Sequence, residues 1–223
     1  MPGELSLQLP KARILCLHGY GQNADFFRAR TGALRKALKS SCDFTFLDGT
    51  FEARASFLGD ADGERGAALG WWEWEEADRR ASTSTAYVGV DTTILRIREV
   101  IQAEGPFDGL LGFSQGATLA ALLCLDPEPP PLKFALFFAA FAPKDPRVST
   151  LFEREPGQKL LLPTLHVMGK TDALVPMESS KRVSEAFAKG QVLVHEGGHA
   201  VPSGAPERAA VKQFIAEQRA PPP

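Results

Sequence analysis

The stretch LLGFSQGATLAALL, residues 110–123, decides how this sequence is interpreted, because three patterns meet in it. An apolar run ends at Gly112, a single serine, Ser114, stands between Gly112 and Gly116, and a helical run of small residues follows. A buried strand that turns sharply into a helix accounts for all three patterns. The G-x-S-x-G motif would hold Ser114 on that turn with its hydroxyl exposed above a sheet, where a serine can act as a nucleophile.

Short apolar runs alternate with longer helical patterns on both sides of this turn. The predicted strands are residues 13–17, 44–47, 108–113, 134–139, 164–169 and 192–195. The predicted helices are residues 25–39, 86–104, 116–125, 177–190, closed by Gly190, and 206–218, opened by Pro206. Most of the strands are continuous apolar runs, which is typical of strands covered on both faces. The sequence therefore predicts an α/β fold: a mostly parallel central sheet with helices on both faces, and ligands at the carboxyl ends of the strands.

Residues 48–85 interrupt this alternation after the second predicted strand. The segment is rich in Gly, Ala, Asp and Glu, and its GWWEWEEADRR run, residues 70–80, contains all three tryptophans of the chain. Long irregular segments inside compact domains usually have a function or are disordered. Two interpretations stay open: Trp71, Trp72 and Trp74 attach the segment to the body of the protein, or they form an apolar lid over a pocket.

Length and composition indicate an ordinary globular protein. The 223 residues suit a single domain, residues 1–223, although two small domains would also fit, and we expect the end of the chain, residues 219–223, to be flexible. The formal charge of −2 and the absence of any long run of Lys and Arg argue against nucleic acid or an anionic membrane as a partner.

The N-terminal sequence and the cysteines together predict where the protein is located. The N-terminus has no signal-peptide pattern, and no apolar run reaches the roughly 18 residues that a membrane helix needs. Cys16, Cys42 and Cys124 are widely spaced and odd in number, so we expect small buried hydrophobic residues in a reducing compartment. The expected location is the cytoplasm.

A nucleophilic serine needs a base and an acid that orients the base. In the fold predicted here they follow in the order Ser, Asp or Glu, His, each after a later strand. HVMGKTDALVP, residues 166–176, supplies Asp172 just past a predicted strand, and VLVHEGGHAVP, residues 192–202, supplies His199 in a glycine-containing loop. We therefore predict that Ser114, Asp172 and His199 are the catalytic residues.

Other acids and histidines compete for these roles. His195 is an alternative base, but it is the last residue of its predicted strand, so we expect it to lie within the sheet and not to reach the serine above the sheet edge. His166 lies inside a predicted strand. Asp145 also follows a strand and is an alternative acid. His195 and His199 are four residues apart, but neither a helix nor a nearby third ligand supports a zinc site, so no metal is expected.

Acyl transfer also needs donors for the developing oxyanion. The backbone N–H of the residue after the nucleophile is one, which gives Gln115, and an N–H after an early strand is the other. CLHGYGQN, residues 16–23, leaves the first predicted strand through a glycine-containing turn, and Tyr20 is the predicted second donor. We expect His18 to support this turn, although the turn could also be an ordinary strand-to-helix connection.

The segments LCLHGYGQNADFFRARTGALRKAL, GWW, GPFDGLLGFSQGATLAALL, HVMGKTDALVP and EGGHAVP resemble the FSH family of serine hydrolases, a branch of the α/β-hydrolases. The resemblance implies the α/β-hydrolase fold and a compact esterase or thioesterase with Ser114, Asp172 and His199 as its triad. It also implies that the tryptophan-containing insertion shapes the acyl pocket, with Trp71 and Trp72 contacting substrate. Acyl-protein thioesterases also carry GFSQG and an early HG turn, but they lack TGALRKAL and GWW.

The predicted activity is hydrolysis of carboxylic esters of medium- to long-chain acids through an acyl-enzyme, with no cofactor and a small-molecule substrate. An acyl thioesterase is the alternative activity, and a non-hydrolysing binding protein on the same scaffold is a third possibility. The sequence makes no prediction about the oligomeric state.

Overall fold

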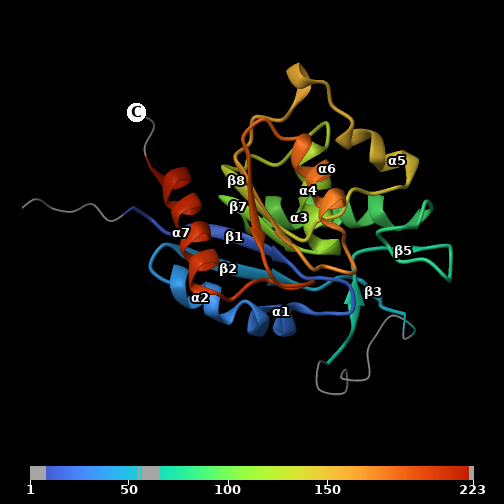
Figure 1. Ribbon diagram of the computed structural model, residues 1–223, viewed down its shortest axis with the longest axis horizontal. Coiled ribbons are helices and arrows are strands. Elements are labelled where there is room, and N and C mark those ends of the chain that lie inside the picture. Colours follow the sequence, from blue (N-terminus) through green and yellow to red (C-terminus); the bar gives the residue numbers. More distant parts are fainter. Residues whose placement is uncertain (1–8, 55, 57–65, 221–223) are drawn as a thin grey trace, which may run out of the picture.

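A six-stranded sheet forms the centre of the protein in the computed structural model, which describes residues 9–54, 56 and 66–220 (Figure 1). Its strands are β1 (Ala12–Leu17), β2 (Cys42–Leu47), β7 (Gly109–Phe113), β8 (Phe134–Phe138), β9 (Thr164–Gly169) and β10 (Gly190–His195). They lie in the order β10-β9-β8-β7-β1-β2, and every neighbouring pair is parallel. The predicted parallel sheet is confirmed, and all six carboxyl ends lie along one edge.

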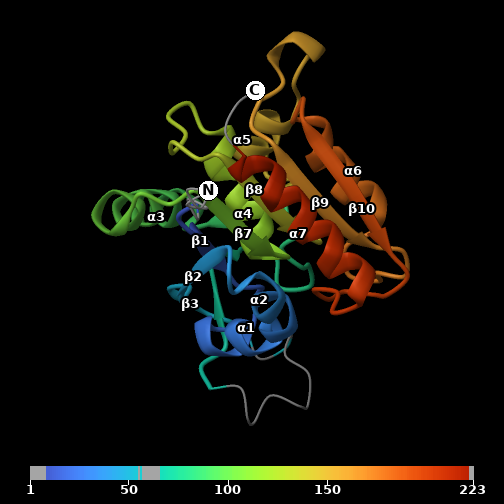
Figure 2. The ribbon, with the colours of Figure 1, turned by 90° about the vertical axis from the view of Figure 1, so that its left-hand side faces the viewer.

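Helices cover both faces of this sheet (Figures 1 and 2). They are α1 (Ala24–Arg30), α2 (Gly32–Leu38), α3 (Val90–Glu104), α4 (Gln115–Leu125), α5 (Pro146–Ser149), α6 (Met177–Glu185) and α7 (Ala205–Arg219), with 3-10 turns η3 (Thr150–Phe152) and η4 (Pro156–Gln158). None of the helices in the described part of the chain is both long and apolar enough to cross a membrane.

The alternation of side chains along each strand divides the interior into two cores. Ile14 and Cys16 of β1 face the core that contains α1, α2 and α7. Leu15 and Leu17 face the other core, with α3, α4 and α6. Because both faces are covered, nearly every residue of the central strands is buried, which explains their continuous apolar sequence.

Three predicted helices differ from the structure by more than one residue at an end or in continuity. The predicted helix 25–39 is broken at Thr31, whose hydroxyl donates to the Phe27 carbonyl and ends α1 before α2 begins. The predicted helix 86–104 starts only at Val90, because Tyr87–Val88 forms a short strand. The predicted helix 177–190 ends at Glu185, and Gly190 is instead the first residue of β10.

The insertion and the residues that directly follow it form two small antiparallel sheets, outside the six-stranded one. β3 (Phe51–Glu52) pairs with β4 (Leu69–Gly70), and β5 (Glu73–Trp74) pairs with β6 (Tyr87–Val88). Trp71, Trp72 and Trp74 are all buried, so they attach the insertion to the body of the protein. Residues 55 and 57–65, part of the possible lid, and residues 221–223 of the tail lie outside the described residues.

Candidate active site

Ser114 stands on a tight turn between β7 and α4. Its backbone has φ 52° and ψ −117°, a left-handed value of φ that a non-glycine residue adopts only at an energetic cost. Both flanking glycines are required by close packing. A Cβ on Gly112 would lie 2.4 Å from the Ala117 Cα, and one on Gly116 would lie 2.3 Å from the Leu17 carbonyl oxygen. The predicted strand–turn–helix geometry of the G-x-S-x-G motif is confirmed.

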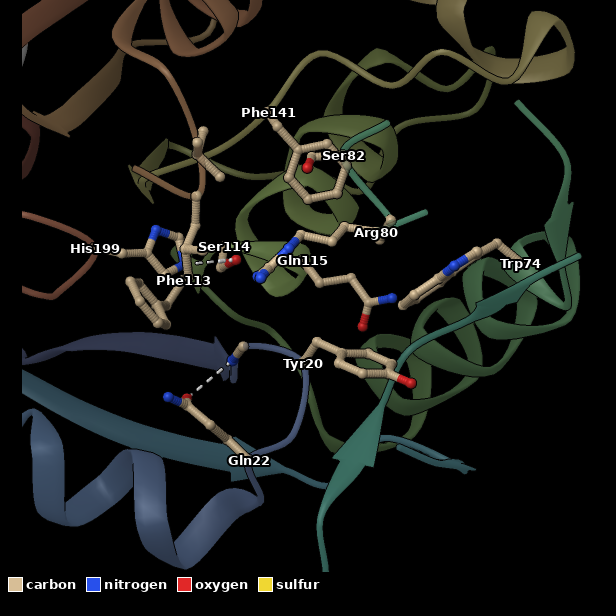
Figure 3. A pocket seen from close by; sticks show the side chains of 14 residues that line it. Tyr20, Gln22, Trp74, Arg80, Ser82, Phe113, Ser114, Gln115, Phe141 and His199 are labelled. Carbon is tan, nitrogen blue, oxygen red and sulfur yellow. Dashed lines mark hydrogen bonds between the residues drawn. The ribbon is translucent and has the colours of Figure 1, made fainter. Parts of the chain in front are cut away.

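The structure brings Ser114, His199 and Asp172 together at the carboxyl edge of the sheet. The distance from His199 Nε2 to Ser114 Oγ is 3.0 Å (Figure 3). The distance from His199 Nδ1 to Asp172 Oδ2 is 2.7 Å. Because a carboxylate can only accept, His199 Nδ1–H donates to Asp172, which leaves Nε2 free to accept the Ser114 proton. This chain of hydrogen bonds is the arrangement that activates a serine hydroxyl.

Asp172 is held as a carboxylate. Its side chain is 1% exposed. Burial opposes ionisation, but the hydrogen bonds from His199 and from the backbone N–H groups of Leu174 and Val175 outweigh it and keep the pKa of Asp172 below its usual range. The two backbone donors also fix the carboxylate, so its second oxygen faces the imidazole.

His195 and Asp145, the alternative base and acid, lie elsewhere. His195 ends β10 and accepts a hydrogen bond from the Gly197 N–H through its Nδ1. Asp145 is buried at the start of α5, where it accepts from the Tyr87 N–H at 2.7 Å and pairs with Arg147 at 2.6 Å. Among the described residues, no group of three or more His, Cys, Asp or Glu side chains is placed to hold a metal ion.

The turn after β1 faces Ser114 across the pocket and offers one backbone donor. Within the turn, the Gly19 N–H donates to Gln22 Oε1 and the Gly21 N–H donates to the Leu69 carbonyl. The backbone N–H groups of Tyr20 and Gln115 have no hydrogen-bond acceptor within the described part of the chain, and both residues line the pocket. These two N–H groups are therefore available to a ligand oxygen, as their predicted role requires.

His18 and the Gln115 side chain connect this turn to the insertion. His18 is fully buried: its Nδ1–H donates to the Gly19 carbonyl, its Nε2 accepts from the Gly49 N–H at 2.9 Å, and its own carbonyl accepts from the Trp71 indole. Burial lowers the pKa of His18 to about 4, so the ring is neutral at physiological pH. The expected supporting role of His18 agrees with these contacts. The Gln115 amide accepts from the Trp71 N–H and donates to the Trp72 carbonyl, each at 2.8 Å.

The pocket beside Ser114 is lined by different insertion residues from those expected. Trp71 and Trp72 were predicted to contact substrate, but they are 0% exposed and do not line it, because Trp71 packs on His18 and Trp72 on Tyr87. The insertion residues that do line it are Trp74, Arg80, Ala81 and Ser82 (Figure 3). No sequence signal distinguishes Arg80 from its neighbour Arg79, since both lie in an irregular, charged segment.

The parallel sheet, its helices and the serine on the strand-to-helix turn define the class of the protein: it has the α/β-hydrolase fold. The chain belongs to the family described as serine hydrolase (FSH1), whose sequence model matches residues 7–211. It is 36% identical over 226 residues to esterase OVCA2 of Bos taurus, covering 92% of this chain and 96% of that protein. It is 34% identical over 222 residues to esterase C25G4.2 of Caenorhabditis elegans, covering 94% and 95% of the two chains. The crystal structure of Arabidopsis thaliana SOBER1 shares the fold, with a TM-score of 0.65, 18% identity, and coverage of 94% and 99%.

Proposed function

We propose that this serine hydrolase cleaves carboxylic esters of medium- to long-chain acids by two-step acyl transfer. The observation that carries the proposal is the continuous chain of hydrogen bonds from Ser114 Oγ through His199 to the Asp172 carboxylate. A lone serine in a turn would have no base in contact, whereas here the acceptor nitrogen lies within proton-transfer distance of the hydroxyl.

In the first step, His199 Nε2 takes the hydroxyl proton while Ser114 Oγ attacks the ester carbonyl carbon. The carbonyl oxygen becomes an oxyanion, which the N–H groups of Tyr20 and Gln115 bind. Asp172 stabilises the imidazolium that forms, without itself becoming protonated. His199 then gives the proton to the departing alcohol, leaving the acyl group on Ser114.

In the second step, His199 takes a proton from water, which attacks the acyl carbon. The oxyanion again lies between the N–H groups of Tyr20 and Gln115, and its collapse releases the acid and returns the proton to Ser114. Each step uses groups of this chain and water alone.

The lining of the pocket supports an apolar acyl chain. Trp74, Phe141, Leu174 and Val175 give it apolar walls, and the cavity, about 190 Å³ in volume, opens to solvent. The three cysteines are buried and unpaired, which supports a reducing compartment such as the cytoplasm.

A fluorophosphonate probe and a substrate panel test this function. The wild-type protein should be labelled and should hydrolyse p-nitrophenyl esters from acetate to dodecanoate, with the longer acyl groups preferred. Ser114→Ala should abolish labelling and turnover, and Asp172→Asn should lower kcat up to about ten-thousandfold.

The same panel contains acyl-CoA thioesters of matched length. A higher kcat/KM on these thioesters would make the protein a thioesterase, and a sharp maximum at acetate would contradict the acyl-chain proposal. A wild-type protein that is neither labelled nor active would be a binding protein on this scaffold instead.

A further inference from the structure

The two residues whose backbone N–H groups would bind the oxyanion, Tyr20 and Gln115, are attached to the insertion by their side chains. Figure 3 shows both side chains extending away from His199. Gln115 is buried, and its carboxamide accepts from the Trp71 N–H and donates to the Trp72 carbonyl. Because the carboxamide bonds to backbone groups through both its oxygen and its nitrogen, its orientation is fixed. Residues 71 and 72 therefore hold the Gln115 end of the oxyanion site.

The Tyr20 hydroxyl is held by Glu73 and Arg54. It donates to Glu73 Oε1 at 2.6 Å and accepts from the Arg54 backbone N–H at 2.7 Å. Burial and the hydrogen bond to Glu73 raise the pKa of Tyr20, so the phenol stays protonated and can donate. The Arg54 guanidinium pairs with Glu73 Oε2 at 2.7 Å and lies over the Trp74 ring, 4.9 Å from its centroid. The carboxylate that holds Tyr20 is therefore itself fixed in place.

Gly70 lies between the side chains of Tyr20 and Gln115. A Cβ on Gly70 would lie 2.7 Å from Tyr20 Cδ2 and 3.2 Å from Gln115 Oε1. Gly70 ends β4 and Glu73 begins β5, so residues 70–73 form one short connection between the two small sheets. This connection contacts both residues of the oxyanion site.

The backbone of the turn that carries Tyr20 is also bonded to the insertion. The Gly21 N–H donates to the Leu69 carbonyl, and the Leu69 N–H donates to the Gln22 carbonyl, each at 2.8 Å. The turn therefore cannot move independently of β4, and the Tyr20 side chain adds a second attachment at the start of β5.

The spacing of the two donors matters for the reaction. Oxyanion stabilisation depends on donors that are in place before the charge develops. A displacement of about 1 Å in an active site can lower a rate about a hundredfold. The N–H groups of Tyr20 and Gln115 come from segments far apart in the chain, and residues 70–73 are the part of the insertion that bonds to both side chains.

We propose that residues 70–73 set the spacing of the two oxyanion donors, with Glu73 as the positioning residue for Tyr20. Glu73 is not among the described residues that line the pocket, so it acts on the reaction through Tyr20. The inference rests on the proposed ester hydrolysis and gives the insertion a part in the chemical step, beyond its part in the pocket wall.

The first test compares Tyr20→Phe, Glu73→Ala and Glu73→Gln on p-nitrophenyl hexanoate, with active sites counted by fluorophosphonate labelling run to completion. Tyr20→Phe and Glu73→Ala should each lower kcat about tenfold, part of the loss that follows removal of a whole donor. KM should stay within about twofold, because the lost interaction acts in the transition state. Glu73→Gln should recover part of the rate, since its amide oxygen can still accept from Tyr20. The double variant Tyr20→Phe/Glu73→Ala should lose no more than the larger single loss.

An alkyl trifluoromethyl ketone separates positioning from a general loss of structure. Ser114 Oγ adds to its carbonyl carbon, the hydroxyl proton passes to His199, and the ketone oxygen becomes an oxyanion at the same two N–H groups. The inhibition constant should therefore rise in Tyr20→Phe by the factor by which kcat falls. Unfolding of part of the sample would lower the number of labelled sites but would not change this constant.

Tyr87→Phe is the matched control. It also removes one phenol hydroxyl that bonds to the insertion, in this case to the Ala81 carbonyl at 2.7 Å. That hydroxyl makes no hydrogen bond to the oxyanion residues or to residues 70–73 in the described part of the chain. Both kcat and the inhibition constant should keep their wild-type values.

Three results would overturn the inference while leaving ester hydrolysis intact. They are an unchanged kcat in Tyr20→Phe, a loss that lies in KM with an unchanged inhibition constant, and an equal loss of kcat in Tyr87→Phe. If Glu73→Ala yields no folded protein, Tyr20→Phe and Glu73→Gln decide the question. A wild-type protein that neither hydrolyses the ester nor reacts with the fluorophosphonate would instead contradict the proposed function itself.

Discussion

Ser114 keeps a backbone conformation that costs on the order of 1–3 kcal/mol, so its surroundings must impose that conformation. The Ser114 N–H donates to the Phe138 carbonyl at 2.8 Å, and the Ser114 carbonyl accepts from the Ala117 and Thr118 N–H groups at 3.0 Å. The first of these bonds connects Ser114 to β8 of the sheet, and the other two connect it to α4. The side chain has no part in them, so its hydroxyl remains available to His199.

The two histidines after β10 should behave differently when each is replaced by glutamine. His199→Gln should lower kcat by several orders of magnitude, because glutamine cannot take the serine proton. His195→Gln should keep most of the activity, since His195 bonds only to the nearby Gly197 N–H. Steady-state kinetics on one p-nitrophenyl ester compares them. A nearly normal rate in His199→Gln, with loss in His195→Gln, would identify His195 as the base.

The residues of the proposed triad could be selected from the sequence because each has a local signal. Ser114 has its flanking glycines, Asp172 follows a strand, and His199 follows Gly197 and Gly198. The competing Asp145 shares the signal of Asp172, and only the fold shows that it bonds to Tyr87. Residue type and chain order therefore suffice to select candidate catalytic residues when the fold sets the order of those residues along the chain. They do not show which other side chains line the pocket.

At the scale of elements, close contact between β1 and α4 makes the turn at Ser114 possible. Gly116, in the first turn of α4, lies against the Leu17 and His18 carbonyl groups at the end of β1. Both contacts are with backbone atoms, which cannot rotate away as a side chain can. The close approach of the helix to the strand is therefore possible only because Gly116 has no Cβ.

Gly116→Ala should destabilise the protein by about 1–3 kcal/mol, because the added methyl group forces α4 away from β1. Gly32→Ala is the matched control, since a Cβ on Gly32, the first residue of α2, would meet no atom within 4 Å. That variant should be neutral or slightly more stable. Urea denaturation measures both free energies of unfolding. Equal stability of the two variants would contradict the close contact.

The order of the main elements could be predicted from the sequence, whereas some boundaries and the insertion could not. Buried parallel strands and amphipathic helices have strong apolar patterns, which explains why all six strands were found. Thr31, which ends α1, interrupts no such pattern. The insertion's part of the pocket wall consists of Trp74, in a strand of two residues, and of the irregular residues 80–82. The position of the insertion depends on long-range bonds such as that from Trp71 to Gln115.

At the scale of the whole molecule, two neutral histidines are part of the buried interior. His166 lies in β9 against Phe137 and Phe187, and burial lowers its pKa to about 3. The pKa of His18 falls to about 4 for the same reason. In the unfolded chain both would titrate near pH 6.5. The unfolded state therefore binds protons first as the pH falls, and the native state loses stability from about pH 6.5 down to the folded pKa values.

Replacement of His166 by glutamine should reduce this sensitivity to acid. Between pH 7 and pH 5, the wild-type free energy of unfolding should fall by about 2 kcal/mol more than that of His166→Gln, because glutamine does not titrate. Urea denaturation at several pH values gives both slopes, and comparing slopes removes any constant cost of the substitution. Parallel slopes would contradict a neutral buried His166.

The pairing of β5 with β6 allows the pocket wall to vary separately from the reaction centre. Glu73 pairs with Val88 and Trp74 with Tyr87, so residues 75–86 leave and re-enter the same small sheet. Ser114, Asp172 and His199 follow strands of the large sheet and share no hydrogen bond with that loop among the described residues. Exchange of residues 75–86 between related proteins is thus a route to new substrate preferences on an unchanged catalytic framework, in evolution as in the laboratory.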